Sequence, residues 1–289
     1  MITFTFPNEY FSPKATLECG QTFRFSPCGE SAWLVLCADK ACLLKECAAE
    51  VRVSCEEADE QYFRGYFDLE TDYAALLKEA EAFAVLSEAV RFGRGLRILN
   101  QDKAECLLSF IVSQQNNIPR IKGTLSRLCA SLGEKKRFAG YDYYTFPSLE
   151  RLAERDEYFY RSLGLGYRAR YVAASSKKLL EEGFSSVEGK TGAELKRALT
   201  AYPGIGNKVA DCISLFAFRE TAAFPVDTWI ARLYRENFGG AETDREKINR
   251  FFVAKFGPNA GIFQQYLFHV IPVNELFFQS VVQNLHVTV

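Results

Sequence analysis

Alternation of apolar and polar residues is the main feature of the first 55 positions or so. The run ITFTF at 2–6 alternates strictly, and turn segments such as SPCGES and ADK separate the short runs that follow. These β-rich runs are TLEC, QTFRFS, AWLVLC, ACLLKE and VRVSC. A period of two is typical of half-buried strands. The pattern therefore predicts a β-rich N-terminal part.

From about residue 56 the apolar positions recur at helical spacing. One helix is marked by the residues from Ala104 to Ile111, and the next by those from Ile118 to Leu128, with Gly133 as its stop. Other helices are predicted near 56–66, 71–92, 148–162, 167–182, 192–202, 207–218, 227–238, 243–256 and 259–270. A β-rich part at 1–99 followed by a helical part at 100–289 predicts an α+β fold.

The segment YPGIGNKVADC at 202–212 is a tight turn that opens onto an apolar helix. It joins the helices predicted at 192–202 and 207–218, which makes 192–218 a candidate helix-hairpin-helix. Gly204 and Gly206 frame the turn and leave its backbone N–H groups free, and the following helix adds the positive end of its dipole. This arrangement predicts a cradle for a phosphate group.

Two chemically active side chains accompany the cradle. Lys208 lies in the first turn of the second helix, where the dipole disfavours a positive charge, so we expect a lowered pKa and a more nucleophilic amine. Asp227 follows nineteen positions later, in FPVDTW. An amine and a carboxylate beside a phosphate cradle suit nucleophilic attack on the sugar of a nucleotide. The alternatives are an ordinary Lys–Asp salt bridge and, for Asp227, a role as a helix N-cap alone.

The net charge of −1 conceals an uneven distribution along the chain. Residues 1–99 carry 10 basic and 16 acidic side chains, whereas residues 100–289 carry 25 and 20. The window 110–215, which holds the hairpin, has 17 basic and 11 acidic residues. Phosphate binding depends on such a local field rather than on the chain total, so the helical part is the candidate for nucleic-acid contact. Solvated helix faces are the alternative.

The nine cysteines are odd in number, and the first six contain no CxxC pair. We therefore expect free thiols, with no metal site and no cofactor. No apolar stretch approaches the ~18 residues that a membrane span requires. The first residues, MITFTFPNEYFSPK, also lack the pattern of a secretory signal. These features predict a cytoplasmic protein that does not bind membranes.

With PGIGNKVADC and PVDTW both in view, the chain resembles the helix-hairpin-helix DNA glycosylases, specifically the 8-oxoguanine DNA glycosylase/lyase group. The match runs from about residue 16 to about residue 270 in the order of the family. It includes CGQTFRF at 19–25, YFDLETDYAALL at 66–77, GLRIL at 95–99, ECLLSFIVSQQNNIPRI at 105–121, FPSL at 146–149, LGLGYRARYV at 163–172 and GIFQQYLF at 261–268.

The resemblance implies a bifunctional DNA glycosylase/AP lyase that excises 8-oxoguanine from duplex DNA. In such enzymes the hairpin lysine, here Lys208, attacks C1′ of the damaged nucleotide and forms a Schiff base, with the aspartate, here Asp227, in support. Cleavage of the N-glycosidic bond is then followed by β-elimination. The damaged base must first be flipped out of the duplex, because it is out of reach inside it.

The resemblance also implies a pocket for the flipped base. Cys212 and Phe268 would flank the base, and Gln264 would read its Watson–Crick edge. Gly20 would present its backbone carbonyl to N7–H, which 8-oxoguanine carries and guanine lacks, since guanine N7 is an acceptor. A fixed carbonyl would bond the first base and repel the second.

Contacts to the rest of the duplex are implied as well. The positions that fill the hole and contact the unpaired base, which we expect to be cytosine, are matched by Asn116, Arg120, Tyr167 and Arg168. Gln115 lies in the same DNA-contacting segment but departs from the asparagine common there, and Trp229 replaces a usual histidine that contributes to phosphate binding. The tail after about residue 271 has no aligned counterpart. We expect a monomer acting on double-stranded DNA.

Two other functions stay open at this stage. One is a glycosylase of the superfamily for another damaged base, since an alkylbase enzyme would keep Asp227 without needing Lys208. The other is a non-catalytic DNA-binding protein that uses the hairpin only for phosphate contact. An endonuclease III type would carry a four-cysteine iron–sulfur cluster near its C-terminus, and no cysteine follows Cys212.

Overall fold

A five-stranded antiparallel sheet forms the N-terminal part of the structure, a computed structural model that describes residues 1–270. Its strands lie in the order β1-β5-β4-β3-β2. Their bounds are β1 Ile2–Pro7, β2 Phe25–Gly29, β3 Ala32–Cys37, β4 Lys40–Glu46 and β5 Glu50–Cys55. In β5 every second residue, from Val51 to Cys55, is buried in a core shared with Phe63 of helix α2 (Glu60–Tyr66). The predicted alternation thus lays one face of the sheet on α2.

One predicted strand is wrong, because TLEC belongs to helix α1 (Pro13–Glu18). The Ser12 hydroxyl accepts a hydrogen bond from the Ala15 amide at 3.3 Å, and Pro13 occupies the first helical position. This N-cap and proline start a helix whatever the β propensity of the next residues. The predicted strand QTFRFS is also shorter than expected and enters β2 only at Phe25.

The rest of the described chain is helical apart from one hairpin, which confirms the α+β class. The predicted helices at 71–92 and 148–162 are each interrupted, giving α3 (Tyr73–Ala80) and α4 (Ala84–Phe92), then α7 (Leu149–Ala153) and α8 (Glu157–Ser162). The others are α5 (Lys103–Ser113), α6 (Ile118–Leu132), α9 (Ala169–Glu182), α10 (Gly192–Thr200), α11 (Asn207–Phe218), α12 (Thr228–Phe238), α13 (Arg245–Phe256) and α14 (Ala260–Val270). Over residues 1–270 no helix has the length and apolar character needed to cross a bilayer.

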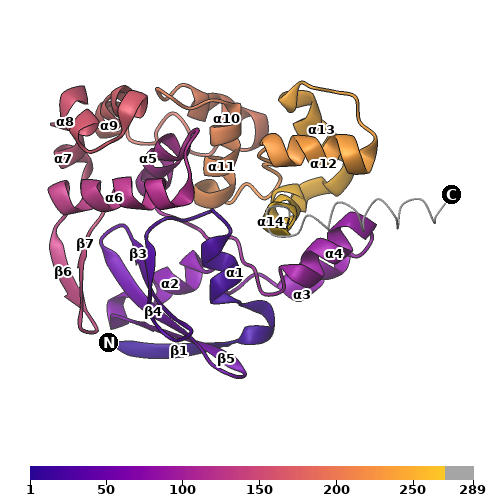
Figure 1. Ribbon diagram of the computed structural model, residues 1–289, viewed down its shortest axis with the longest axis horizontal. Helices are drawn as coiled ribbons and strands as arrows, with labels where there is room; N and C mark the ends of the chain where they lie inside the picture. The colour runs from indigo at the N-terminus through magenta and orange to yellow at the C-terminus, as the bar shows by residue number, and fades with distance from the viewer. Residues whose placement is uncertain (271–289) are drawn as a thin grey trace.

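The hairpin formed by β6 (Lys135–Phe138) and β7 (Tyr141–Tyr144) was not predicted from the sequence. Four residues a strand are too few to show a clear period of two. Phe138 and Tyr143 pack on Leu34 and Ala41 of the sheet. Figure 1 shows the hairpin extending from the helical layer alongside the sheet. It covers part of the sheet face that α2 leaves open.

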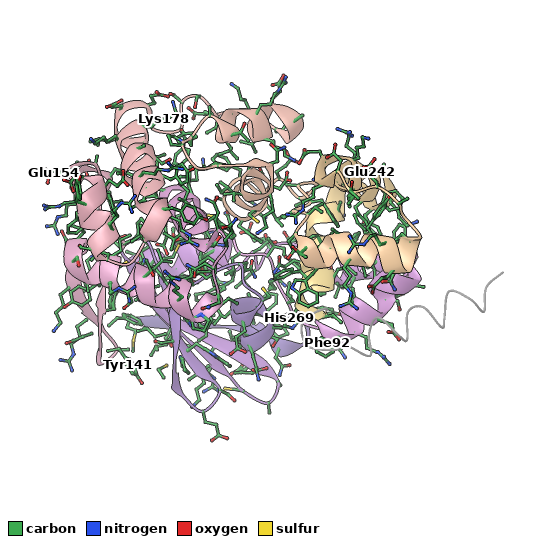
Figure 2. All side chains as sticks on the ribbon, turned by 45° about the horizontal axis from the view of Figure 1, so that its top comes forward. Phe92, Tyr141, Glu154, Lys178, Glu242 and His269 are labelled. Carbon is green, nitrogen blue, oxygen red and sulfur yellow. The ribbon has the colours of Figure 1, made fainter. Side chains whose placement is uncertain are left out.

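Helix α14 packs against the segment that follows the sheet in sequence, helix α4 and the residues just after it. It packs on α4, where the rings of Phe92 and His269 lie 5.8 Å apart (Figure 2). The Tyr266 hydroxyl donates to the Leu96 carbonyl at 2.6 Å. The last described helix is therefore fixed against residues from the first third of the chain.

A buried ion pair joins the sheet to helix α5. Arg24 Nη1 and Glu105 Oε2 lie 2.8 Å apart, and the Ala38 amide donates to the same oxygen at 2.7 Å. Arg24 Nη2 also donates to the Tyr144 carbonyl of β7 at 2.6 Å. Burial raises the pKa of the Glu105 carboxyl even with Arg24 beside it. The pair therefore depends on both partners, because either charge alone would be buried without compensation.

We expect Arg24→Met to lower the free energy of unfolding by about 3–5 kcal/mol, since it strands the Glu105 carboxylate. Urea denaturation at neutral pH measures this change. The double variant Arg24→Met/Glu105→Gln should regain part of the loss, because it leaves no unpaired buried charge. A single variant as stable as the wild type would contradict this role for the pair.

Candidate active site

The predicted helix-hairpin-helix is present as α10, a turn at 201–206, and α11. Gly204 has a φ of +84°, and a Cβ on it would lie 2.5 Å from Cγ of Tyr171. Only glycine fits there, for both conformational and steric reasons. Gly206 is the exposed N-cap of α11, with open space where a Cβ would point. The two glycines therefore differ: Gly204 permits the turn to form, and Gly206 keeps the helix N-terminus uncovered.

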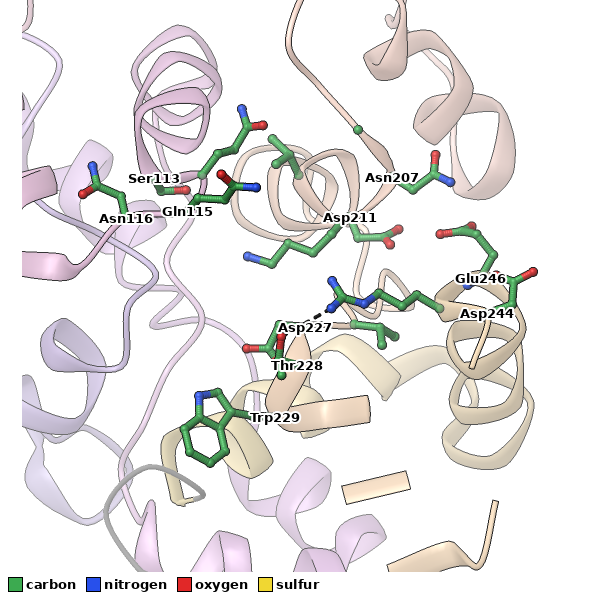
Figure 3. Close-up of a pocket in the computed structure, with 16 residues that line it drawn as sticks. Ser113, Gln115, Asn116, Asn207, Asp211, Asp227, Thr228, Trp229, Asp244 and Glu246 are labelled. Carbon is green, nitrogen blue, oxygen red and sulfur yellow. Dashed lines mark hydrogen bonds between the residues drawn. The ribbon is translucent and has the colours of Figure 1, made fainter. Parts of the chain in front are cut away.

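A cavity of about 780 Å³ opens in front of this helix N-terminus. Its walls come from the end of α5, the start of α11, and the starts of α12 and α13. Figure 3 shows Gln115 and Asn116 at one end of it and Asp244 and Glu246 at the other. The sequence-predicted residues that line it are Gln115, Asn116, Gly206, Lys208 and Asp227. Trp229, whose side chain is exposed, lines it too.

A second, much smaller cavity of about 40 Å³ brings together the residues predicted for base recognition. Its lining includes Gly20, Cys212, Gln264 and Phe268, together with Lys208 and Asp227. The amine and the carboxylate therefore line both cavities and stand where the two meet. A volume of this size holds no more than a few water molecules. A base could enter only if the walls moved apart.

The electrostatic surroundings of Lys208 differ from expectation. Its pKa is raised, because Cys212 one turn further along α11 and the Asp227 carboxylate together outweigh the desolvation of the amine end. Burial also raises the pKa of the Cys212 thiol, although the neighbouring Lys208 amine opposes this shift. The prediction of a pKa lowered by the helix dipole is wrong. Lys208 must lose a proton before it can act as a nucleophile.

Asp227 is both a helix cap and a cavity residue. Its Oδ1 accepts a hydrogen bond from the Ile230 amide at 2.9 Å and so caps α12. The cap holds the side chain in one orientation at the edge of the two cavities. Capping and chemistry are therefore compatible in this residue, and the first does not exclude the second.

Gln264 has a buried side-chain oxygen without a hydrogen-bond partner in the described residues. Its side chain is buried on α14, and the oxygen concerned is Oε1. A buried carbonyl oxygen without a donor is costly, so such groups commonly find a partner in a ligand or water. The N1–H and N2–H donors on the Watson–Crick edge of a guanine-type base would satisfy it. Gly20 lies beside Phe268 in the same cavity, and a Cβ added to Gly20 would lie 3.4 Å from Cε1 of Phe268.

Arg168 is bonded to the backbone of the loop that follows α5. It is only 4% exposed and donates to the Gln114 carbonyl from Nε at 2.7 Å and to the Gln115 carbonyl from Nη2 at 2.9 Å. Its donors thus face the backbone of residues 114–115. Here Arg168 supports this loop, in which Gln115 adopts a left-handed φ of +46°, and its direct contact with cytosine stays a prediction.

The other three residues predicted beside the unpaired base are accessible. Tyr167 is 40% exposed, with its ring under the Arg168 guanidinium at 4.5 Å. Asn116 donates from Nδ2 to the Val112 carbonyl at 3.1 Å and lines the larger cavity. Arg120 is exposed in the first turn of α6. Tyr167 and Arg120 are free to meet a nucleic-acid strand.

An ion-pair network in the wall of the larger cavity was missed in the sequence. Asp211 on α11 is buried, and its Oδ2 accepts from Lys196 Nζ of α10 at 2.9 Å. Lys196 also lies 2.8 Å from Glu246 Oε2 of α13. Burial raises the pKa of Asp211 to about 7, although Lys196 opposes the shift. The one available indication was an acidic residue inside an otherwise apolar helix.

Two further cavity residues were also missed. Gln114 donates from Nε2 to the Gly204 carbonyl at 2.8 Å and so joins the end of α5 to the hairpin turn. Arg245, the first residue of α13, donates from Nη2 to the Thr228 hydroxyl at 3.3 Å, the contact dashed in Figure 3. Neither has a local sequence pattern, because each contact joins residues distant in the chain.

Comparison with known families divides the chain into two matched regions. Residues 3–107 match the family model of the 8-oxoguanine DNA glycosylase N-terminal domain. Residues 108–258 match the model of the HhH-GPD superfamily base excision DNA repair protein.

Two curated relatives share the same description. The chain is 34% identical over 216 residues to the N-glycosylase/DNA lyase OGG1 of Arabidopsis thaliana, covering 69% of this chain and 58% of that protein. It is 32% identical over 234 residues to a probable N-glycosylase/DNA lyase of Methanothermobacter thermautotrophicus, covering 74% and 73%. The chain thus spans less than two thirds of the Arabidopsis protein.

Solved structures share the fold at similar identity. The apo-form of the 8-oxoguanine glycosylase/lyase of Clostridium acetobutylicum superposes with a TM-score of 0.88 at 32% identity, covering 92% of this chain and 95% of that one. Its complex with double-stranded DNA containing cytosine opposite 8-oxoguanine superposes with a TM-score of 0.86, covering 90% and 91%. With both family models matched in order, the chain belongs to the HhH-GPD superfamily of base excision DNA repair proteins, and its N-terminal part is an 8-oxoguanine DNA glycosylase N-terminal domain.

Proposed function

We propose that this protein is a bifunctional DNA glycosylase/AP lyase that excises 8-oxoguanine from duplex DNA. The observation that carries the proposal is the pair of adjoining cavities with Lys208 and Asp227 at their junction. The larger cavity suits a DNA backbone in front of a helix N-terminus, and the smaller one suits a flipped base once its walls open. The relatives that align with much of this chain are described as N-glycosylase/DNA lyases, which supports the same glycosylase and lyase reaction.

The amine carries the covalent chemistry in this proposal. Lys208 gives up its proton to water, and its lone pair attacks C1′ while the bond to the base breaks. The base leaves with the electron pair of that bond and takes up a proton, so Asp227 stays ionised. Asp227 stabilises the positive charge that develops on the sugar as the base departs. Opening of the sugar ring yields a Schiff base between Lys208 and C1′. Loss of a proton from C2′ then expels the 3′ phosphate by β-elimination.

Recognition of the lesion rests on two edges of the base. Gln264 supplies the unpartnered Oε1 for the Watson–Crick edge, and the Gly20 carbonyl accepts N7–H. A site built to bond a polar group rejects an analogue that lacks it, because its own polar group is then left unpaired. Cys212 and Phe268 form the faces of the pocket.

On the opposite strand we propose cytosine as the preferred partner, read by Arg120 and stacked on Tyr167. The Clostridium relative was crystallised with cytosine opposite the lesion. Arg168 contributes by holding the loop that carries Asn116. We further propose that the protein acts as a monomer. A purely DNA-binding role would leave the junction of amine and carboxylate without a purpose, and an alkylbase glycosylase would not need Lys208.

Lys208→Gln should abolish both base release and the adduct trapped by borohydride on 8-oxoguanine DNA, while binding to that DNA changes little. The reason is that the variant keeps the hairpin but removes the nucleophile. Lys190→Gln, at an exposed lysine before α10, is the matched control and should behave as the wild type. Excision by Lys208→Gln within tenfold of the wild-type rate would refute the assignment.

Asp227→Asn should slow single-turnover excision by on the order of 10²-fold or more, because it removes an electrostatic stabiliser. Asparagine caps a helix as well as aspartate does, so the melting temperature should barely move. Asp244→Asn is the control, since Asp244 caps α13 in the same cavity through the Glu246 amide at 2.8 Å. Equal kinetic effects of the two substitutions would reduce Asp227 to a cap.

Arg120→Ala should flatten the preference for cytosine over adenine opposite the lesion by roughly tenfold, given ~1–3 kcal/mol for a good base contact. Excision opposite cytosine should fall only modestly. Single-turnover rates on four duplexes that differ in the opposite base measure this. Wild-type rates that are equal on all four would show that Arg120 reads no base.

A further inference from the structure

The turn that carries Gly20 is anchored on both sides by buried glutamine side chains. Gln265 of α14 donates from Nε2 to the Cys19 carbonyl at 2.8 Å. Gln101 donates from Nε2 to the Gln21 carbonyl at 2.6 Å. The carbonyl groups of the residues before and after Gly20 are therefore bonded to separate parts of the fold. No donor within residues 1–270 occupies the Gly20 carbonyl itself.

Gly20 needs this anchoring because of its own backbone. Its φ is +82°, a region where glycine passes readily between conformations. A carbonyl that distinguishes N7–H from a bare N7 must keep one direction, since hydrogen bonds weaken steeply with misalignment. The local chain cannot impose that direction, so it must come from contacts elsewhere.

Gln265 supplies the contact from the site's own helix. It is 3% exposed and lines the smaller cavity beside Gln264, on a helix that also bonds Leu96 through Tyr266. Gln264 and Gln265 are adjacent in α14, one at the wall predicted to read the Watson–Crick edge and the other bonded to the turn predicted to read N7. The two recognition elements are thereby held in register by one rigid element.

We propose that Gln265 is a positioning residue for lesion discrimination, acting through its hydrogen bond to the Cys19 carbonyl to fix the direction of the Gly20 carbonyl. The inference rests on the proposed function. In this proposal Gln265 acts through the backbone of the Gly20 turn, so its loss should affect the choice between 8-oxoguanine and guanine rather than DNA binding in general.

The test uses Gln265→Met, which keeps the side-chain length and removes the donor. Dissociation constants are measured for duplexes that carry a single non-cleavable 2′-fluoro nucleotide, either 8-oxoguanine or guanine, opposite cytosine. We expect the affinity ratio to shrink about tenfold, the scale of a buried hydrogen bond lost from a polar site. The change should come from weaker binding of the lesion duplex, with affinity for the guanine duplex unaltered.

Tyr266→Phe is the matched control, because it removes a buried hydrogen bond to the Leu96 carbonyl from the next residue of the same helix. It should lower stability comparably and leave the affinity ratio unchanged. If Gln265→Met also leaves the ratio unchanged, or weakens both duplexes equally, Gln265 is structural only and the inference fails.

A second variant guards against a failure of Gln265→Met to fold. Gln265→Glu can donate to the Cys19 carbonyl only while its carboxyl is protonated, so its ratio relative to wild type should recover as the pH is lowered. A ratio independent of pH would overturn the inference. A wild-type protein with no preference for 8-oxoguanine would instead refute the proposed function, so the two failures are distinguishable.

Discussion

Helix α5 is held at both ends, and this constraint fixes the N-terminal sheet relative to the hairpin. In its first turn Glu105 forms a buried ion pair with Arg24. Loss of either partner would leave the other charge buried and unpaired. At its other end the Gln114 amide donates to the Gly204 carbonyl. Between these points the Phe110 ring stacks on a phenylalanine of α11 at 5.5 Å. The sheet, α5 and the hairpin are therefore one mechanical unit, and the cavities form where its parts meet.

The smaller cavity is assembled from segments that are far apart in the chain. Gly20 comes from the N-terminal part, Lys208 and Cys212 from the hairpin helix, and Gln264 from the last described helix. At about 40 Å³ it is too small to hold a base as it stands. Opening it costs free energy for any base, and only a base that makes new bonds inside can offset that cost. In the proposed function, a pocket this small adds to selectivity beyond the hydrogen bonds themselves.

The sequence allowed the helix-hairpin-helix and most helices to be predicted, because glycine spacing and apolar periodicity are local properties. The residues of the smaller cavity followed from the family resemblance instead. Errors arose where the structure or charge of a residue depends on contacts that the local sequence pattern does not show. Ser12 and Pro13 turn a β-rich run into α1. Lys208 keeps its proton because of Cys212 and Asp227, against the dipole of its own helix. The orientation of Arg168 could not be read from the sequence either, because it depends on the backbone carbonyls of residues 114–115.

The left-handed Gln115 has a consequence for how the protein meets DNA. A non-glycine residue in that region carries on the order of 1–2 kcal/mol of strain, and the charged hydrogen bonds from Arg168 compensate it within the folded protein. The loop at 114–116 is therefore shaped before any strand arrives. In the proposed function, this loop needs no ordering step before it meets a duplex, so diffusion and orientation rather than folding of the contact surface would set the rate of capture.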